Sequence, residues 1–440
     1  MLPLLVPTEA LPPRTAACEH VLLAACALLV VAGIGLRVQD LAFPAEFTFD
    51  ERWFVRGARR YLAHQPDQND HPPLGKLFIA ASIALLGDHA FAWRLPSLLA
   101  GITNIGLAGV LAQRLFKDRV AGALAAAFVA VDGFLLVHSR SAVMDEGLTT
   151  WFLATVLLLV VGQGPAALGA AALLVGGATA TKFSGVVLLI PLTGTLLLRR
   201  RSLPWWSPAL LGFAGLAYTG ACSAGLALTH QPWGPAAVWA DTRRLFELQW
   251  GRQDWINPWL SHWYGWFIPT RPLTLAYVRL PGHQLRAMTT LGNLPLWWGT
   301  HLALLIALGA TLGSFVREFV LPRLPRLDAA IPRIPNSGFV ATHRSAVAWL
   351  LVLWACPILP WVVSNRDSYL YHYLPAWPYA VILSAGWTAW VWRTRPALVW
   401  VALLMIAVTF VAYAPVWGGL TIRPATWRML LFGPGWARPR

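Results

Sequence analysis

The sequence predicts an all-α integral membrane protein of about eleven transmembrane helices and two long extracytoplasmic loops. Hydrophobic residues make up 57% of the 440 positions and charged residues only 12%, whereas a soluble domain carries about a quarter charged residues. The mean hydropathy is +0.56, and apolar runs long enough to cross a bilayer recur along the whole chain. The 25 tryptophans suit membrane interfaces, and the 33 prolines suit broken helices and structured loops.

The apolar runs place the spans in order. The first span, at about 20–37, lacks a convincing small-residue cleavage site and is expected to be a signal anchor. The other spans are expected at about 94–114, 119–137, 146–162, 165–181, 184–198, 206–228, 294–316, 345–363, 372–391 and 397–413. A shorter apolar stretch at 77–86 reads as a re-entrant or interfacial helix.

Three polar segments separate the spans within what reads as one integrated domain over residues 1–440. They are a first outer loop at 38–92, a Trp-rich second outer loop at 229–293, and a linker at 317–344 in which Arg alternates with Pro. With the N-terminus in the cytoplasm, Arg199–Arg201 and the linker also fall inside, as the positive-inside rule requires. Both long loops then face the outer side of a cell membrane.

The formal net charge of +15 does not indicate a nucleic-acid partner, because no soluble basic domain is visible. Arginines of short loops orient a membrane protein, and the others can face lipid phosphates. The four cysteines sit in or beside apolar runs without ligand spacing and read as packing residues. A divalent metal is possible at an outer-loop carboxylate, but no ligand set with good spacing supports one.

An acidic pair, Asp50-Glu51, follows the first span. Aromatic neighbours such as Phe49 and Trp53 would partly desolvate it, and a carboxylate in such surroundings can be tuned for general-base work. A solvated loop is the alternative. Further along the same loop, His71-Pro72-Pro73-Leu74-Gly75-Lys76 has two prolines that fix an extended entry to a helix. There, contact of His71 and Lys76 with a phosphate or sugar is as plausible as a rigid turn.

Later segments add charged groups at the same predicted membrane face. Ionisable residues at a membrane boundary are usually paired or functional. Asp132 reads as structural, whereas Arg140 and Asp145 fit either a stapling ion pair or a site. Lys182, in Thr181-Lys182-Phe183-Ser184-Gly185, suits a lipid-linked phosphate, although a snorkelling lysine is the ordinary reading. In the loop 364–375, Arg366 and His372 can bind an anion.

These clusters converge on one face, and the chain has no nucleotide-binding Gly-rich loop. An enzyme without nucleotide-sugar machinery can draw an activated sugar from a lipid carrier. Cations would then hold the phosphate leaving group while a carboxylate deprotonates the acceptor hydroxyl.

Several motifs, in order along most of the chain, resemble those of the protein O-mannosyltransferase family, of the GT-C class of membrane glycosyltransferases. They are the acidic pair at 50–51, HPPLGK at 71–76, HSRSAVMDE at 138–146, TKFSG at 181–185, GWFIPTRPLTLAY at 265–277, GNLPLWW at 292–298 and YLYHYLPAWPY at 369–379. The resemblance implies an inverting transfer of mannose from a polyprenyl phosphate to Ser/Thr of exported proteins. Asp50 becomes the general base, and Glu51 assists substrate placement. The implied donor contacts are His71, Lys76, Arg94 (in WRLPS), Arg140, Asp145, Lys182, Arg366 and His372.

The sequence departs from the family pattern in places. Leu294 stands where the family usually has Pro, and the second outer loop has no room for the β-trefoil insertion of eukaryotic members, which suggests a bacterial member. The alternatives are a related transferase with another sugar or a lipid or glycan acceptor, and a transporter or flippase. A transporter should show repeated halves, and none is visible.

Overall fold

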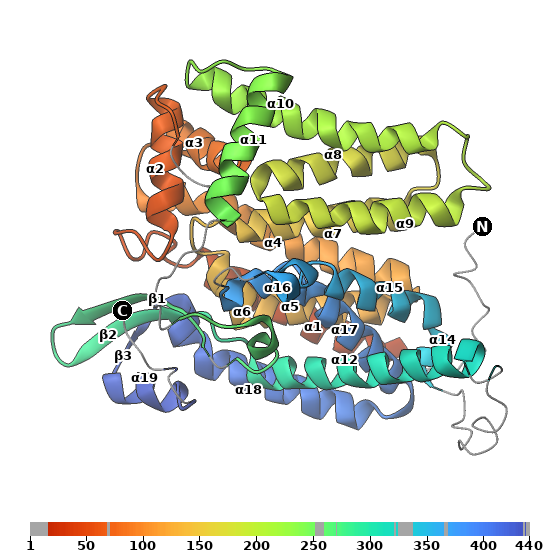
Figure 1. Cartoon of the computed structure of the whole chain (residues 1–440). Helices are drawn as coiled ribbons and strands as arrows, with labels where there is room; N and C mark the ends of the chain where they lie inside the picture. Colours follow the sequence, from red (N-terminus) through yellow and green to blue (C-terminus); the bar gives the residue numbers. More distant parts are fainter. Residues whose placement is uncertain are drawn as a thin grey trace.

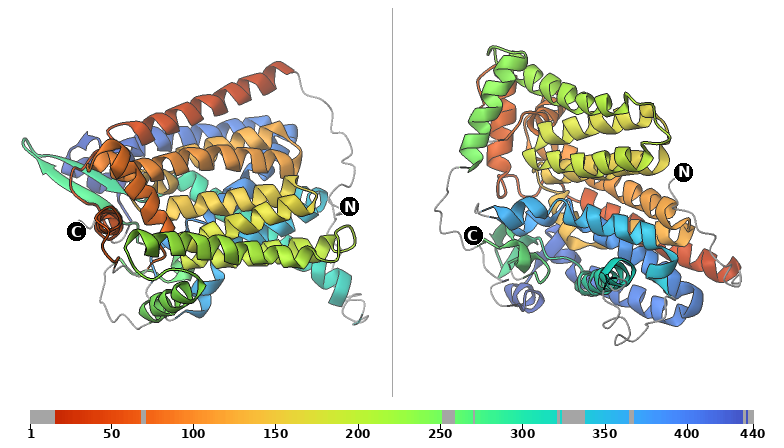
Figure 2. Two further views of the ribbon diagram at one scale, coloured as in Figure 1. Left: turned by 90° about the horizontal axis from the view of Figure 1, so that it is seen from above. Right: turned by 45° about the vertical axis from the view of Figure 1, so that its right-hand side comes forward.

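The fold is a helical bundle with small outer elements at one end, seen in a computed structural model of the chain. The structure describes residues 16–67, 71–250, 259–269, 271–320, 323, 338–364, 368–433 and 436. The bundle helices are α1 (Ala16–Val38), α4 (Ala90–Phe116), α5 (Arg119–Val131), α7 (Asp145–Val161), α8 (Pro165–Thr181), α9 (Leu189–Arg199), α10 (Gly212–Leu228), α12 (Leu294–Phe315), α15 (Arg344–Ala355), α17 (Trp377–Thr394) and α18 (Pro396–Gly418). They run roughly side by side (Figure 1; Figure 2, left).

Shorter elements occupy the two ends of this bundle. They are α2 (Glu51–Leu62), α3 (Leu74–Leu86), α6 (Gly133–His138), η1 (Phe183–Leu188), η2 (Ser207–Leu211), α11 (Pro235–Trp250), η3 (Trp263–Trp266), η4 (Val316–Val320), α14 (Phe339–Thr342), α16 (Leu359–Val363), η6 (Leu370–Tyr373) and α19 (Pro424–Leu430). Helices α2, α3 and α11 lie at one end, and α14 lies at the other (Figure 1). Both predicted outer loops therefore lie at the same end. Most of the predicted linker at 317–344 falls outside the described residues.

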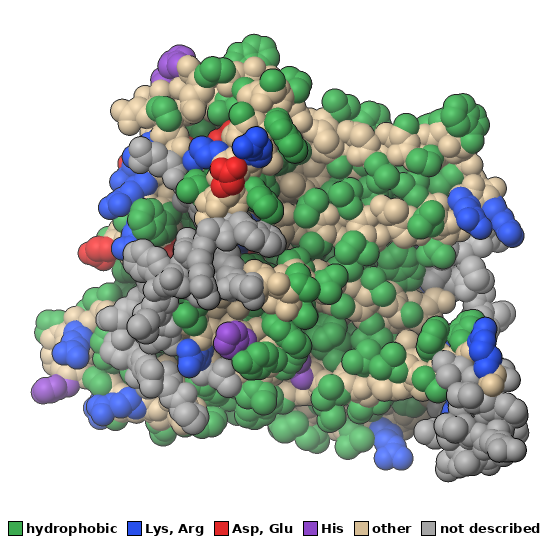
Figure 3. Space-filling view, viewed as in Figure 1, with side chains coloured by type: hydrophobic (Ala, Val, Ile, Leu, Met, Phe, Trp, Pro, Cys, Tyr) green, Lys and Arg blue, Asp and Glu red, His purple; other side chains and the backbone are tan. Residues whose placement is uncertain are grey.

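The bundle surface suits a lipid environment. Five helices of the described part are long and apolar enough to cross a membrane: Ala17–Val38, Ala90–Phe116, Ser207–Leu228, Leu294–Phe319 and Pro396–Gly418. Leucines and valines on α12 and α18 are exposed, including Leu305 at 67% and Val411 at 71%. Hydrophobic side chains cover the middle of the visible face, and most of its Lys and Arg side chains lie toward its two ends (Figure 3). The count of eleven spans remains a prediction.

Some predicted spans are broken, in each case beside a residue that favours a break. The span expected at 119–137 divides at Asp132, whose backbone is extended and whose Oδ1 accepts from Leu135 N at 3.1 Å, capping α6. The span at 345–363 divides into α15 and α16 around Cys356-Pro357, because proline interrupts the helical hydrogen bonds. The break at Asp132 turns the chain toward the outer elements, and the Asp132 carboxylate also accepts from Trp377 Nε1 at 3.2 Å.

A small antiparallel sheet, which the sequence did not predict, joins the second outer loop to the segment after α18. It consists of β1 (Thr274–Leu280), β2 (Gln284–Thr289) and β3 (Thr421–Ile422), in the order β1-β2-β3. The turn at Pro281-Gly282 is a strong turn signal, and Gly282 adopts φ +73°, which glycine accommodates readily. This hairpin projects at the same end as α2 and α3 (Figure 1) and brings Leu275 to the site described next.

Candidate active site

Segments that are distant in sequence meet around a small cavity, here called the central cavity. Its lining comes from the first outer loop, α6 and α7, the turn after α8, the β1 strand and η6. The residues are Phe49, Asp50, Phe54, His71, His138, Val143, Asp145, Lys182, Leu275 and Tyr371. The structure thus brings together Asp50, His71, Asp145 and Lys182 from the predicted set.

Asp50 is held at this cavity by an unusual turn. Phe49, just before it, has φ +38°, in the left-handed region that non-glycine residues seldom adopt. The Phe49 ring is buried edge-on against Tyr371 and Tyr369, with ring centroids 5.5 and 6.3 Å apart. Strained backbone persists only where its surroundings fix it, and here aromatic packing fixes the residue that precedes the half-buried Asp50.

Glu51 points away from the central cavity and into a fully buried ion pair with Arg94. Its Oε1 accepts from Arg94 Nε at 2.8 Å and from Ala142 N at 2.8 Å, and its Oε2 accepts from Thr48 N at 2.7 Å. Neither side chain of the pair is exposed to solvent. Glu51 therefore joins the first outer loop to α4 and to the segment that follows α6.

The guanidinium groups of Arg94 and Arg140 both donate hydrogen bonds within the protein. Arg94 also donates to three loop carbonyls, those of Leu41, Pro44 and Glu46. Arg140 is buried and donates to backbone carbonyls at the end of α1 and beyond it, those of Leu36, Arg37, Gln39, Asp40 and Gly418. Both arginines hold the chain around the site, and neither lines the central cavity.

Asp145 forms an ion pair with Lys182. The alternative of a structural ion pair between Arg140 and Asp145 is therefore wrong. Lys182 Nζ donates to Asp145 Oδ1 at 2.8 Å, and both side chains are nearly buried. The lysine has extended backbone between α8 and η1, and its Nζ lies 5.1 Å from the Tyr371 ring centroid. The pair supplies a buried positive group whose position is fixed by a carboxylate and an aromatic face.

A second, narrow cavity adjoins the first and shares Asp145 and Lys182 with it. His372 lines it and stacks on Trp361 at a centroid distance of 3.8 Å. Tyr369 N donates to His372 Nδ1 at 3.1 Å, so Nδ1 is unprotonated and the ring proton lies on Nε2. His372 and Lys182 are therefore two N–H donors on one adjoining cavity. Arg366, also predicted here, lies outside the described residues.

Lys76, the lysine of HPPLGK, is fully buried within the first outer loop. Its ammonium forms an ion pair with Asp67 and donates to the His71 carbonyl at 2.6 Å. Tyr61 donates to the same Asp67 carboxylate at 3.4 Å. Burial, and then the charge of Asp67, raise the pKa of Tyr61, which keeps the phenol neutral as a donor. Lys76 thus supports His71, which lines the central cavity, and does not itself line it.

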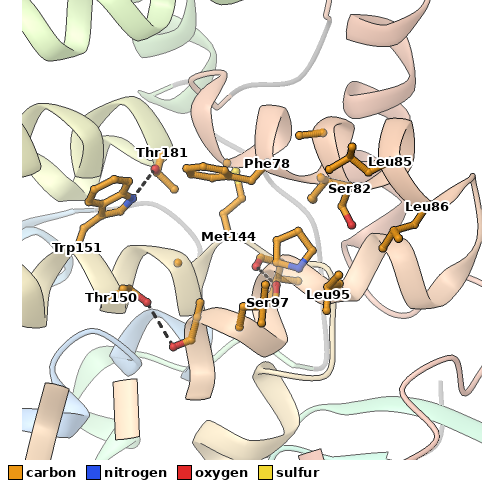
Figure 4. A pocket seen from close by; sticks show the side chains of 18 residues that line it. Phe78, Ser82, Leu85, Leu86, Leu95, Ser97, Met144, Thr150, Trp151 and Thr181 are labelled. Atoms are coloured by element: carbon orange, nitrogen blue, oxygen red, sulfur yellow. Dashed lines mark hydrogen bonds between the residues drawn. The ribbon is translucent and has the colours of Figure 1, made fainter. Parts of the chain in front are cut away.

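An apolar groove of about 590 Å³ lies between α3, α4, α7 and α8. Phe78, Leu85 and Leu99 on its walls are exposed, and Trp151 Nε1 donates to Thr181 Oγ1 at 3.0 Å at one end (Figure 4). Val143 lines both this groove and the central cavity. A surface of this kind suits a hydrocarbon chain.

The predicted site set omitted His138, Tyr371 and Leu275, which line the central cavity. His138 and Tyr371 lie inside the HSRS and YLYHYLP motifs, so the motifs themselves were a signal. Leu275 lies inside the GWFIPTRPLTLAY motif at 265–277, and the β1–β2 hairpin brings it to the cavity. Among the described residues, no three His, Cys, Asp or Glu side chains gather so that they could hold a metal ion.

Two family profiles match the chain. Residues 70–220 match the family described as dolichyl-phosphate-mannose-protein mannosyltransferase, and residues 237–436 match the C-terminal four-TMM region of protein-O-mannosyltransferase. The chain belongs to the protein O-mannosyltransferase family. Family membership confirms the resemblance drawn from the motifs.

Curated relatives are similar over a shorter stretch. A polyprenol-phosphate-mannose–protein mannosyltransferase of Mycobacterium tuberculosis is 30% identical over 122 residues, which are 26% of this chain and 23% of the relative. The corresponding protein of Mycolicibacterium smegmatis is 28% identical over 122 residues, 26% of this chain and 24% of the relative. The matched stretch spans about a quarter of each of these relatives.

A solved structure, that of the S. cerevisiae protein O-mannosyltransferase Pmt1-Pmt2 complex bound to the sugar donor, matches with a TM-score of 0.75. The identity is 13%, and the match covers 97% of this chain and 93% of that chain. At 13% sequence identity, this similarity is evidence for the fold only. The predicted fold class, a multi-pass membrane protein of the GT-C type, is confirmed.

Proposed function

We propose that this family member transfers mannose from a polyprenyl-phosphate carrier to Ser/Thr hydroxyls of exported proteins, inverting the configuration at the sugar C1. The observation that carries the proposal is the meeting of Asp50 and Lys182 on one cavity. A carboxylate there can take a proton, and an ammonium there can hold an anion. The names of the mycobacterial relatives support this donor and this acceptor.

The reaction is a single displacement. Asp50 takes the proton of the acceptor hydroxyl as its oxygen attacks C1 of the mannose. The new C1–O bond forms on one face of the sugar while the bond to the phosphate oxygen breaks on the other. The electron pair of that bond leaves with the polyprenyl phosphate. The cavity's small size would hold the reacting atoms close together, which lowers the entropic barrier.

Lys182 and His372 are the proposed contacts of the leaving phosphate. The Lys182 ammonium faces both cavities, and the His372 ring lines the adjoining one. Donors fixed in advance stabilise charge that develops on a leaving group. Asp145 fixes the lysine, and Trp361 fixes the histidine by stacking. Arg366 stays a predicted donor contact.

The first outer loop, within residues 38–92, is the proposed catalytic loop, and His71 is its proposed phosphate or sugar contact. Glu51 and Lys76 assist by positioning, through the buried pairs with Arg94 and Asp67. We place this loop and the second outer loop, residues 229–293, on the outer side of a cell membrane, with the N-terminus and the linker 317–344 in the cytoplasm. Arg199–Arg201, at the end of α9 and just after it, support this orientation by the positive-inside rule.

The test is transfer from labelled polyprenyl-phosphate-mannose to a Ser/Thr peptide in membranes that contain the protein. Label on the peptide is expected. The apolar groove, which meets the central cavity at Val143, favours a second candidate, transfer to a lipid acceptor. Label found only in lipid products would replace the protein acceptor by this candidate.

Lys182→Met is expected to lower kcat for peptide mannosylation by about 10²–10³-fold, the usual cost of losing one preorganised donor. The substitution also leaves Asp145 buried without its partner, so a loss of stability accompanies it. The double variant Lys182→Met/Asp145→Asn removes both charges and should recover the thermal stability in detergent but not the activity.

Lys117→Asn is the matched control, because Lys117 is an exposed C-cap of α4 in the left-handed region, which Asn tolerates. Its activity should equal that of the wild type. A folded Lys182→Met/Asp145→Asn protein with wild-type kcat would rule out the phosphate contact.

A further inference from the structure

His138 is a buried histidine that lines the central cavity and has no role in the proposed mechanism. It ends α6 and is 2% exposed. Its ring is held by Phe134, edge-on at 4.8 Å between centroids, and it lies 6.5 Å from the Tyr371 ring. It shares the cavity lining with Asp50 and Lys182. A polar ring fixed at this place must face whatever occupies the cavity.

One nitrogen of this ring is committed to the protein. His138 Nδ1 lies 2.7 Å from the Phe134 carbonyl oxygen. A carbonyl can only accept, so Nδ1 carries the proton and, in the neutral imidazole, Nε2 carries the lone pair. Nε2 forms no hydrogen bond with any residue that the structure describes, and it is not one of the fully buried unpaired atoms. An occupant of the cavity can therefore reach it.

The two histidines of the site, His138 and His372, therefore differ in which ring nitrogen carries the proton. His372 accepts a hydrogen bond at Nδ1 from Tyr369 N, so its ring proton lies on Nε2. His138 donates at Nδ1 and offers a lone pair at Nε2, which repels phosphate oxygens and attracts a hydroxyl proton. A group that binds at His138 Nε2 must therefore donate a hydrogen bond, as a hydroxyl does.

We infer that His138 Nε2 accepts a hydrogen bond from a hydroxyl of the transferred hexose. This assignment rests on the proposed function, in which the nucleophile arrives at Asp50 and the phosphate leaves at Lys182. The sugar ring must then lie between these two groups, in the cavity that His138 lines. The acceptor hydroxyl cannot serve instead, because its proton goes to Asp50. His138 becomes a specificity-determining contact with the sugar.

The experiment compares polyprenyl-phosphate-mannose with donors whose sugar lacks one hydroxyl at a time, for the wild type and His138→Leu. The wild type should lose roughly ten- to a hundredfold in kcat/KM with one particular deoxy donor, because the imidazole acceptor is then left unpaired. His138→Leu should lose a similar factor with the full sugar and show no further loss with that same donor. Such non-additivity marks a direct contact.

His301 provides the matched control. Its Nδ1 bonds the Trp297 carbonyl at 2.8 Å, as His138 does to Phe134, but its Nε2 is paired with the Tyr373 hydroxyl at 3.1 Å. His301→Leu should change kcat/KM by the same factor for every donor. If His138→Leu does not fold, His138→Gln, which retains an acceptor oxygen, takes its place and should keep part of the discrimination.

The possible outcomes distinguish a wrong assignment of His138 from a wrong proposed function. A folded His138 variant that loses the same factor with every deoxy donor, like His301→Leu, would overturn the sugar contact and leave the proposed function standing. Wild-type protein that transfers no mannose from the full donor would refute the proposed function, and this assignment would fall with it.

Discussion

Asp50→Asn is expected to abolish mannose transfer while the protein stays folded and still binds its donor. The amide cannot take the acceptor proton, and general-base catalysis is worth about 10²–10⁴-fold. The substitution keeps the size of the side chain, and Asp50 is only half-buried, so stability should change little. Turnover of labelled polyprenyl-phosphate-mannose with a Ser/Thr peptide measures the loss, and donor binding measured separately shows whether the site remains intact.

Glu46→Gln is the control for this experiment. Glu46 belongs to the same loop, and its side chain is exposed, while its backbone carbonyl accepts from Arg94. Removing that carboxylate should leave kcat unchanged, which excludes a general effect of loop charge. Wild-type turnover by a folded Asp50→Asn protein would contradict the assignment of Asp50 as the base and would point to another acceptor of the proton.

Arg94→Met is expected to cause the largest loss of stability, about 3–5 kcal/mol, because it leaves the buried Glu51 carboxylate without a counter-charge. The loop carbonyls that Arg94 binds also lose their donor. Thermal unfolding in detergent measures the effect. The double variant Arg94→Met/Glu51→Leu should recover much of the stability, because apolar replacement of a whole buried pair is often neutral.

The exposed pair Arg59–Asp88 gives the comparison, since both side chains are about two-fifths exposed. Exposed pairs contribute about 0–1 kcal/mol, so Arg59→Met should shift unfolding little. If Arg94→Met unfolds like Arg59→Met, the pair Glu51–Arg94 does not anchor the loop. The activity of the stable double variant then tests the loop itself, and it should stay low because Asp50 loses its fixed position.

Composition and apolar runs were enough to predict the membrane class, and the motifs were enough to predict the family. The site was partly predictable too. Asp50 and Lys182 were chosen for their residue types and for a common membrane face, and both line the central cavity. These predictions used only local information, namely hydropathy over the length of one span and residue chemistry within one motif.

Pairings between distant segments could not be predicted in the same way. Arg140 and Asp145 are close in sequence, which suggested an ion pair, but Asp145 meets Lys182 after the turn beyond α8. Arg140 binds backbone carbonyls, and any segment can offer those. Lys76 carries the same charge as Lys182, yet its position in the first turn of α3 directs it to Asp67. Deciding among such partners requires the packing of the helices.

The pairing of Lys182 with Asp145 has a consequence for turnover. The lysine charge is already balanced before any substrate arrives, so a phosphodiester donor meets only a modest attraction. The spent carrier is a monoester, whose phosphate carries a charge of about −1.5 to −2 at neutral pH, and the same lysine holds it more strongly. Release of the empty carrier, and not sugar transfer, would then be the rate-limiting step of each cycle. Accumulated polyprenyl phosphate would slow the enzyme by occupying the place of fresh donor.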